Sequence, residues 1–332
     1  MVKDGIINIS KAQNMTSRDV VNIVRRTLGI RKTGRTGTLD PMATGVLPVC
    51  LGRATRIIEY LDMDFKTYRC TMVLGRHTDT GDVWGTEISR VPEEQVNQVT
   101  EQDVIRAFRP FRGVITQTPP IYSAIRVNGK RLYQYAREGQ TVEIPTRQVF
   151  IRSLTLESVN LGQGYDSSVT FQCQCSKGTY IRSICQEAGE ALGTGGAMSA
   201  LTREASGFFS LEQSLDLPAL ESLSPSERDS HIVPPDAPLT SFGRIEIAGK
   251  DIWRMTNGLT VWRSHCRVTR EPVYASRDFP LPVRDEFRRA YAVYASGQGW
   301  EDYSPGTFLG VAFMDPEGQN LHADKIFKTE GA

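Results

Sequence analysis

The sequence predicts an α+β fold divided into two domains. The chain has 332 residues, about twice the length of one ordinary domain. Up to residue 240, capped amphipathic helices occur together with strands in which apolar and polar residues alternate. A proline-rich stretch at 213–240 has the composition of an irregular interdomain linker, and the short segments beyond it, separated by turns such as 257–258, are typical of a small all-β unit. We therefore expect domains at 1–240 and 241–332.

The first predicted helix spans residues 17–28. Thr16 followed by Asp19 has the spacing of an N-cap, and apolar residues then recur at helical spacing until Gly29 ends the run. Residues 34–48 carry three glycines and two prolines, so we expect a structured loop that leads into a short apolar strand. Loops of this kind often hold functional sites.

Two alternating strands and a second helix are predicted next. Tyr68 begins a run in which every second residue is apolar, and Gly75 ends this run. Thr100 caps a helix that must end near Pro110. The second alternating strand covers about 167–175.

After this strand the chain is predicted to turn and then to stay extended. Residues 176–178 have turn composition, and residues 179–182 continue as a strand before a helix that Gly193 ends. On a strand, Tyr180 and Arg182 point to the same face because they are two residues apart. This arrangement fits ordinary packing between strands. It also fits a site in which the tyrosine ring stacks on a base and the arginine pairs with a carboxylate.

The charge balance and the hydropathy exclude several classes of protein. The 39 Lys and Arg residues nearly equal the 38 Asp and Glu residues, and a net charge of +1 does not suit a protein that coats nucleic acid or binds an anionic membrane through overall charge. No apolar run approaches the length of about 18 residues that crosses a bilayer, and the N-terminus has no secretory signal. We expect a cytoplasmic protein with no membrane contact.

The cysteines and histidines predict no metal site. The six cysteines form no repeated CxxC pair, and the chain has only four histidines. Cys173 and Cys175 are the nearest approach to a ligand pair, but they lie on an alternating strand and are expected to face the core. A disulfide framework does not suit a long cytoplasmic chain.

One acidic residue, Asp40, lies within a basic segment. Residues 18–56 carry eight basic and two acidic residues, a local charge of +6 in a chain of net charge +1. Such a patch suits contact with a phosphate backbone, and it also suits a solvated helix face. Asp40 precedes a proline, which keeps it extended, so its carboxylate fits a nucleophile, a hydrogen-bond acceptor or a turn cap. The basic residues are Arg18, Arg25, Arg26, Arg31, Lys32, Arg35, Arg53 and Arg56.

Three other motifs each have a plain alternative. Residues 29–36 read G-x-x-x-x-G-R-T, which lacks the lysine of a nucleotide-binding P-loop and follows a helix instead of a strand, so we disfavour that function. The turn at 79–82 has too few acids for a calcium loop and is expected to be structural. Residues 117–139 interleave basic and aromatic residues, which fits an RNA-contacting arm or an ordinary amphipathic helix.

Four blocks together resemble the tRNA pseudouridine synthase B family, which isomerises the uridine of the tRNA T loop. They occur in the family's order and cover most of residues 1–210. The resemblance implies a catalytic domain with a central mixed, largely antiparallel β-sheet flanked by helices, and a small β-barrel-like C-terminal domain of the PUA type. The blocks read GRTGTLDPMATGVLPVCLGRATR at 34–56, YRCTMVLGRHTDTGDVWG at 68–85, QTPPIYSAIRVNGKRLYQYAREG at 117–139 and CSKGTYIRSICQEAGEALGTGGAMSALTR at 175–203.

The resemblance also assigns site residues. Asp40 matches the family's catalytic aspartate, and Lys11 falls where the family has a lysine shortly before the first helix. Arg35 stands where the family usually has histidine, and we expect it to contact RNA phosphate. The other substrate-binding positions are Tyr68 for base stacking, Tyr180 as a second active-site tyrosine, Arg182 as the partner of the aspartate and Leu201 as an apolar contact to the base.

The implied reaction is an isomerisation, which requires no cofactor and no metal. The implied partner is the T arm of tRNA, bound by a monomer that needs no partner protein. Residues 117–145 match an RNA-contacting insertion, and 264–303 look inserted relative to the family's C-terminal domain. The alternative is a non-catalytic RNA-binding or tRNA-folding protein on the same scaffold. The joint presence of Asp40, Tyr68 and Arg182 favours the enzyme.

Overall fold

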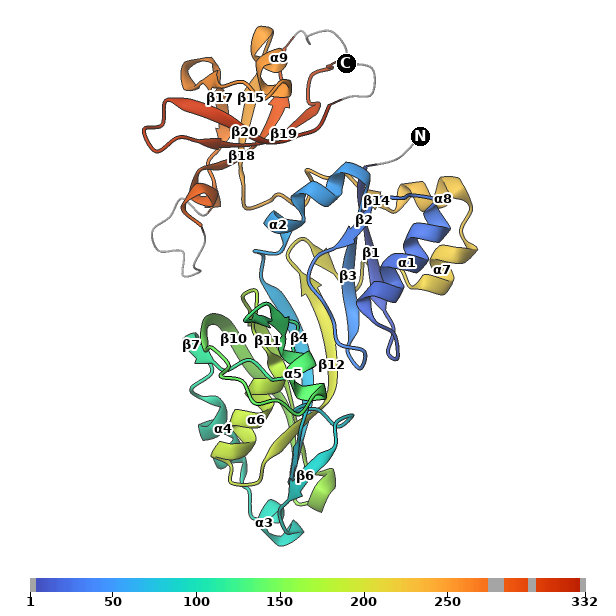
Figure 1. Cartoon of the computed structure of the whole chain (residues 1–332), viewed down its shortest axis with the longest axis vertical. Helices are drawn as coiled ribbons and strands as arrows, with labels where there is room; N and C mark the ends of the chain where they lie inside the picture. Colours follow the sequence, from blue (N-terminus) through green and yellow to red (C-terminus); the bar gives the residue numbers. More distant parts are fainter. Residues whose placement is uncertain (1–3, 274–283, 298–302, 329–332) are drawn as a thin grey trace.

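A computed structural model describes residues 4–273, 284–297 and 303–328 of the chain (Figure 1). Its strands form two main β-sheets, one of ten strands and one of six. All strands of the larger sheet precede residue 234, and all strands of the smaller sheet follow residue 242. No helix in the described part of the chain is long and apolar enough to cross a membrane.

The larger sheet is mixed and largely antiparallel, as expected. Its strand order is β14, β1, β3, β12, β4, β11, β10, β7, and only the contact between β3 and β12 is parallel. The two remaining strands, β2 and β13, pair with β3 and β12. The strands are β1 (Gly5–Lys11), β2 (Thr33–Arg35), β3 (Thr44–Leu51), β4 (Lys66–Leu74), β7 (Gly113–Gln117), β10 (Arg147–Asn160), β11 (Ser168–Cys175), β12 (Gly196–Ser206), β13 (Phe209–Ser210) and β14 (Ile232–Val233).

Two small hairpins and most of the helices lie around this sheet, whereas the last α-helix, at 250–256, packs against the smaller sheet (Figure 1). The hairpins are β5 (Arg76–Thr78) with β6 (Glu87–Arg90), and β8 (Arg126–Val127) with β9 (Lys130–Arg131). The α-helices are α1 (Ser17–Leu28), α2 (Ile58–Leu61), α3 (Glu93–Asn97), α4 (Glu101–Phe108), α5 (Leu132–Arg137), α6 (Ile181–Ala191), α7 (Leu217–Ser222), α8 (Pro225–Ser230) and α9 (Lys250–Thr256). The 3₁₀ helices are η1 (Gly52–Ile57), η2 (Gly164–Asp166), η3 (Arg263–His265) and η5 (Asp285–Arg289).

Local sequence signals explain where the regular elements begin and end. Thr16 and Asp19 form the capping box of α1, and Gly29 ends this helix with φ +66°. Thr100 caps α4 with Asp103 in the same way. These helices and the strands β4 and β11 confirm the predicted elements within one or two residues.

The C-terminal sheet confirms the small β unit expected beyond residue 240. Its strand order is β16, β20, β19, β18, β15, β17. Part of the expected insertion, 274–283 and 298–302, lies outside the described residues, whereas β17 and β18 fall within it and belong to the sheet. The strands are β15 (Gly243–Ile247), β16 (Val261–Trp262), β17 (Arg267–Arg270), β18 (Ala290–Ala295), β19 (Phe308–Met314) and β20 (Asn320–Ile326).

An aromatic cluster joins the C-terminal sheet to the larger one. The ring of Tyr60, at α2, lies 5.1 Å from Phe242 and 5.6 Å from Phe287. Two of the basic residues near the N-terminus also belong to this junction, because Arg53 donates a hydrogen bond to the Lys328 carbonyl and Arg56 donates one to the Ile326 carbonyl. These two arginines of the basic segment therefore have a structural role, because they bind the backbone of the C-terminal region.

Two predicted elements were wrong. Residues 179–182 do not continue as a strand, because Gly178 turns the chain with φ +87° and Tyr180 then caps α6, which places Arg182 in the first turn of this helix. Residues 213–240 are not an irregular linker but form α7, α8 and β14, which pairs with β1. Of the five prolines that suggested a linker, Pro218 and Pro225 stand in the first turns of the two helices, where proline is well tolerated, and the other three follow β14.

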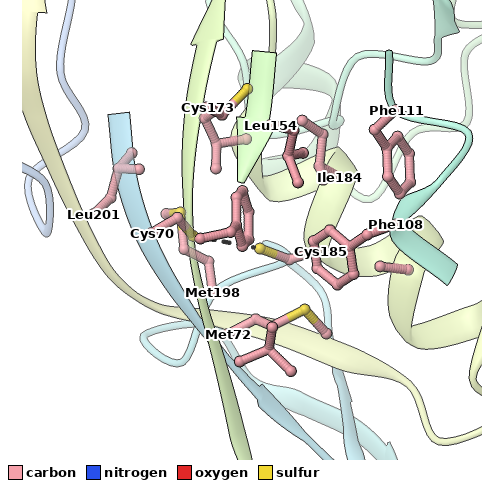
Figure 2. Close-up of a cluster of buried hydrophobic side chains, with 14 of the residues drawn as sticks. Cys70, Met72, Phe108, Phe111, Leu154, Cys173, Ile184, Cys185, Met198 and Leu201 are labelled. Atoms are coloured by element: carbon pink, nitrogen blue, oxygen red, sulfur yellow. Dashed lines mark hydrogen bonds between the residues drawn. The ribbon is translucent and has the colours of Figure 1, made fainter. Parts of the chain in front are cut away.

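The core beneath the expected site is tightly packed (Figure 2). The sulfur of Cys70 on β4 lies 3.6 Å from that of Cys185 on α6, and the ring of Phe108 on α4 lies 5.1 Å from that of Phe171 on β11. Cys173, like Cys175, is fully buried, as the alternation predicted. This packing fixes β4 and α6, the two elements that carry Tyr68 and Arg182, against each other.

Candidate active site

One pocket collects most of the predicted site residues. It has a volume of about 350 Å³ and is lined by the 37–40 loop, residues 123–125, the segment 176–182 and parts of β4 and β12. The predicted residues that line it are Asp40, Tyr68, Tyr180, Arg182 and Leu201. Lys11 and Arg35 are not among the lining residues.

Asp40 and Arg182 form an ion pair in this pocket. Oδ2 of Asp40 lies 3.1 Å from Nη2 of Arg182. The Asp40 side chain is 43% exposed, whereas that of Arg182 is 6% exposed. The carboxylate is therefore open to the pocket, and the cation behind it is buried. The guanidinium thus orients the carboxylate through a charge-assisted contact.

The loop of Asp40 is held from behind by α1. The Leu39 N–H donates to Oγ of Ser17, and the same hydroxyl donates to the Leu39 carbonyl, both at 2.9 Å. The Asn14 N–H donates to the Pro41 carbonyl at 3.0 Å. The proline and these contacts fix the backbone on both sides of the carboxylate, so the loop presents Asp40 in one orientation.

Arg182 is held by two other segments, the turn at 79–82 and the backbone at Tyr122. Its Nη1 donates to the Thr80 carbonyl at 2.8 Å and lies 3.7 Å from Asp82, which is 7% exposed. Its Nη2 donates to the Tyr122 carbonyl at 3.0 Å. The turn at 79–82 is thus structural, as expected, and its structural role is to position the arginine that faces Asp40.

Tyr68 and Leu201 supply apolar surface on neighbouring strands. Tyr68 lies on β4 and Leu201 on β12, and these two strands are antiparallel partners. Burial raises the pKa of the Tyr68 hydroxyl, so the ring stays neutral. A neutral ring beside an aliphatic side chain is the surface on which a flat base stacks.

Tyr180 occupies the N-terminus of α6. The side chain of Gln117, which is fully buried, accepts from the Tyr180 N–H at 3.0 Å and donates to the Tyr180 carbonyl at 3.1 Å. The guanidinium of Arg147 lies 4.6 Å from the centre of the Tyr180 ring. The tyrosine is therefore fixed through both its backbone and its ring.

Lys11 lies beneath the loop of Asp40. The side chain is fully buried, and Nζ donates to the carbonyls of Ala12 and Met15 at 2.8 Å and to that of Pro41 at 3.3 Å. Burial lowers the pKa of Lys11 to about 8. The geometry makes Lys11 a support of the loop, with its ammonium bound to the protein backbone.

Arg35 lies on β2, outside the pocket. Its Nη2 donates to Oγ1 of Thr38 at 3.3 Å, and its Nε is buried without a hydrogen-bond partner. Burial and the nearby Arg18 lower the pKa of the guanidinium. Because residues 33–35 form a strand paired with β3, they do not form the phosphate-binding loop of a nucleotide hydrolase.

Several pocket residues were not found from the sequence. Arg203 is 1% exposed and lines the pocket two residues after Leu201 on the same face of β12. Lys66 and Arg147 line it as well. The two-residue spacing from Leu201 could have indicated Arg203, whereas Lys66 and Arg147 reach the pocket only through the tertiary fold.

The described residues contain no cluster of three or more side chains suited to hold a metal ion. The RNA-contacting segment expected at 117–145 contains the β8–β9 hairpin and α5. Leu132 of α5 is buried, and the guanidinium groups of Arg131 and Arg137 lie 5.9 and 5.3 Å from the ring centre of Tyr133. Cationic and aromatic side chains thus lie together on a segment attached to the pocket.

Comparisons with known proteins agree with this geometry. A family model described as TruB family pseudouridylate synthase, N-terminal domain, matches residues 25–181. The tRNA pseudouridine synthase B of Clostridium tetani is 42% identical over 258 residues, which cover 78% of this chain and 86% of the relative. That of Clostridium perfringens is 38% identical over 318 residues, which cover 96% of this chain and 97% of the relative.

The fold also matches solved structures. A Cbf5 complex with Nop10 and Gar1 contains a chain that superposes with a TM-score of 0.69 at 22% identity, covering 98% of this chain and 84% of that one. At this identity the likeness concerns the fold alone, and it extends over the C-terminal sheet because 98% of this chain is covered. Because the Clostridium relatives are 38–42% identical over most of both chains and the family model matches residues 25–181, the chain belongs to the TruB family of pseudouridylate synthases.

Proposed function

We propose that this protein converts a uridine of the tRNA T loop into pseudouridine, with Asp40 as the catalytic residue. The observation that carries the proposal is the 3.1 Å ion pair between Asp40 and Arg182 at a pocket that Tyr68 also lines. The names of the Clostridium relatives support tRNA as the substrate.

The pocket has the groups that this isomerisation requires. A base inside a folded loop must leave its stack to reach an enzyme pocket, at a cost of a few kcal/mol. Tyr68 and Leu201 offset this cost by stacking and apolar contact with the base. Asp40, paired with Arg182, then acts on the flipped nucleotide so that the glycosidic bond breaks, and the base rotates and rejoins through carbon.

The reaction is an isomerisation, so substrate and product contain the same atoms. No group is transferred to or from the RNA and no electrons are gained or lost, so the chemistry requires neither a metal nor an energy donor. We propose that the protein acts as a monomer on tRNA, with residues 1–240 as the catalytic domain and 241–332 as an RNA-binding domain. The basic and aromatic residues of 117–145 contact the RNA beside the pocket.

The test is incubation of the purified protein with an unmodified tRNA transcript in excess EDTA, followed by nucleoside analysis. We expect one pseudouridine per tRNA, in the T loop. A second transcript in which that uridine is replaced by cytidine should yield none. Tight binding of the first transcript without pseudouridine would instead support a tRNA-folding protein on the same scaffold.

A further inference from the structure

The pocket carries more positive charge than the pair of Asp40 and Arg182 requires. Once this pair is set aside, the charged residues that line the pocket are four cations and one carboxylate, a net charge of +3. A nearby carboxylate usually accompanies buried cations in proteins. The four cations, here called the cationic cluster, are Lys66, Arg147, Lys177 and Arg203, and the carboxylate is Asp62.

Arg203 is the most deeply buried member of the cationic cluster. Its side chain is 1% exposed, and Nε donates to the Val46 carbonyl at 2.6 Å. Its Nη2 is buried and has no hydrogen-bond partner, and among the described residues no carboxylate oxygen lies within 4.0 Å of the guanidinium. A buried charge without a counter-ion costs on the order of several kcal/mol. The protein alone does not provide the anion that this arginine needs.

Arg147 and Lys177 reach the pocket from two other segments, the start of β10 and the loop between β11 and α6. Arg147 stacks on Tyr180, and its Nε is buried without a partner. A side chain at Gly178 would come within 3.1 Å of Nη1 of Arg147, so this glycine lets the loop and the guanidinium lie in contact. The side chain of Lys177 is 55% exposed and its Nζ lies 3.3 Å from Asp62.

The same loop leads directly into α6, a helix of 11 residues. The N-terminus of a helix carries a partial positive charge, which adds to the charge of Arg147 and Lys177. Lys66, buried behind the loop, donates to the carbonyls of Asp62 and Asp64. Four side-chain cations and a helix terminus therefore lie at this one pocket.

We propose that the cationic cluster binds a phosphate group of the RNA backbone next to the nucleotide that enters the pocket. The inference rests on the proposed function, because the backbone is the anion that an RNA substrate brings. A carbonyl of the base needs one donor, whereas a net charge of +3 suits a phosphate. Arg147 and Lys177 contact the phosphate, and Arg203 gains the anionic partner that the protein lacks.

The first experiment changes the RNA and leaves the protein intact. A T-arm RNA is made with one uncharged methylphosphonate linkage, placed 5′ or 3′ of the target uridine or at a distant site in the stem. We expect one of the two flanking linkages to weaken binding by about tenfold, and the distant linkage to have little effect. The proposal is overturned if neither flanking linkage weakens binding more than the distant one.

The second experiment links that phosphate to the cluster. Arg147→Gln and Lys177→Gln should each weaken binding of the unmodified RNA, and in these variants the sensitive methylphosphonate should cause a smaller further loss than in the wild type. Arg152→Gln is the matched control, because Arg152 lies on the same strand and over an aromatic ring, that of Phe65 at 5.2 Å, but does not line the pocket. Equal losses in all three variants would also overturn the proposal.

The outcome separates this inference from the proposed function. If the wild-type protein forms no pseudouridine in any tRNA, the proposed function fails. If it forms pseudouridine but tolerates both flanking methylphosphonates, the proposed function stands and the phosphate site is wrong.

Discussion

Asp82 lies 3.7 Å from Nη1 of Arg182, on the guanidinium whose other nitrogen lies 3.1 Å from Asp40. One buried arginine thus joins two carboxylates, one exposed to the pocket and one 7% exposed behind it. The buried carboxylate orients the arginine, and the arginine orients the reactive one. Three residues far apart in the sequence therefore act as one unit in the proposed reaction.

Asp40→Asn should abolish turnover while tRNA binding stays within about tenfold, or about 1.4 kcal/mol, of the wild type, because binding rests on phosphate and stacking contacts. Nucleoside analysis measures turnover, and filter binding at fixed salt measures affinity. Pseudouridine formation at the wild-type rate would contradict the catalytic assignment.

Asp82→Asn should lower kcat by about 10- to 100-fold with a smaller effect on KM, because the amide keeps the shape but no longer offers Arg182 a charge. Single-turnover kinetics at saturating tRNA measure the effect. The control is Glu87→Gln, which removes an exposed partner of Arg90 in the same β5–β6 hairpin and should leave the rate unchanged. A similar loss in both variants would indicate a general defect of this hairpin.

The sequence predicted the elements whose signals are local. The capping boxes at Thr16 and Thr100 and the alternation from Tyr68 all depend on neighbouring residues. The segment 179–182 was misread because its alternation is too short to distinguish a strand from the first turn of a helix. The linker prediction at 213–240 treated every proline as a breaker, although Pro218 and Pro225 stand at helix starts.

The site could be predicted in part. Resemblance supplied Asp40, Tyr68, Tyr180, Arg182 and Leu201, and the fold brings all five to one pocket. The roles of the supporting residues depend on contacts between distant segments, such as the burial of Lys11 under Pro41 and of Asp82 behind Arg182. No spacing in the sequence encodes such contacts.

Lys11→Met should change how stability depends on pH. The native pKa of Lys11, about 8, lies below its ordinary value of 10.5, so between these values the unfolded chain holds a proton that the native protein has lost. This difference makes stability rise with pH across that window, relative to a protein without the lysine. Urea unfolding from pH 7 to 10 should therefore show a gain in the wild type, relative to the variant, as pH rises. Parallel curves would contradict a buried ammonium.

Gly45→Ala should destabilise the contact between β3 and β12. Gly45 has φ +99°, and a Cβ there would lie 2.3 Å from the Arg203 carbonyl oxygen, so strain and a backbone clash add together. We expect a loss of more than about 2 kcal/mol. Gly162→Ala is the matched control: Gly162 has φ +70° but open space around its Cβ position, and should lose only about 1 kcal/mol. Equal losses would show that the close contact does not matter.

Arg35→Ala should weaken tRNA binding and reduce the slope of log affinity against log salt by about one unit, because one phosphate contact is lost. The guanidinium is half-buried, and among the described residues its Nε has no hydrogen-bond partner and its one side-chain hydrogen bond is the 3.3 Å contact to Thr38. The nearby Arg18 repels it, and an RNA phosphate between the two arginines would relieve that repulsion. Arg35→His should restore part of the affinity, because histidine is usual at this position in the family. Unchanged salt slope and turnover in Arg35→Ala would show that Arg35 does not contact the RNA and that other basic residues bind it.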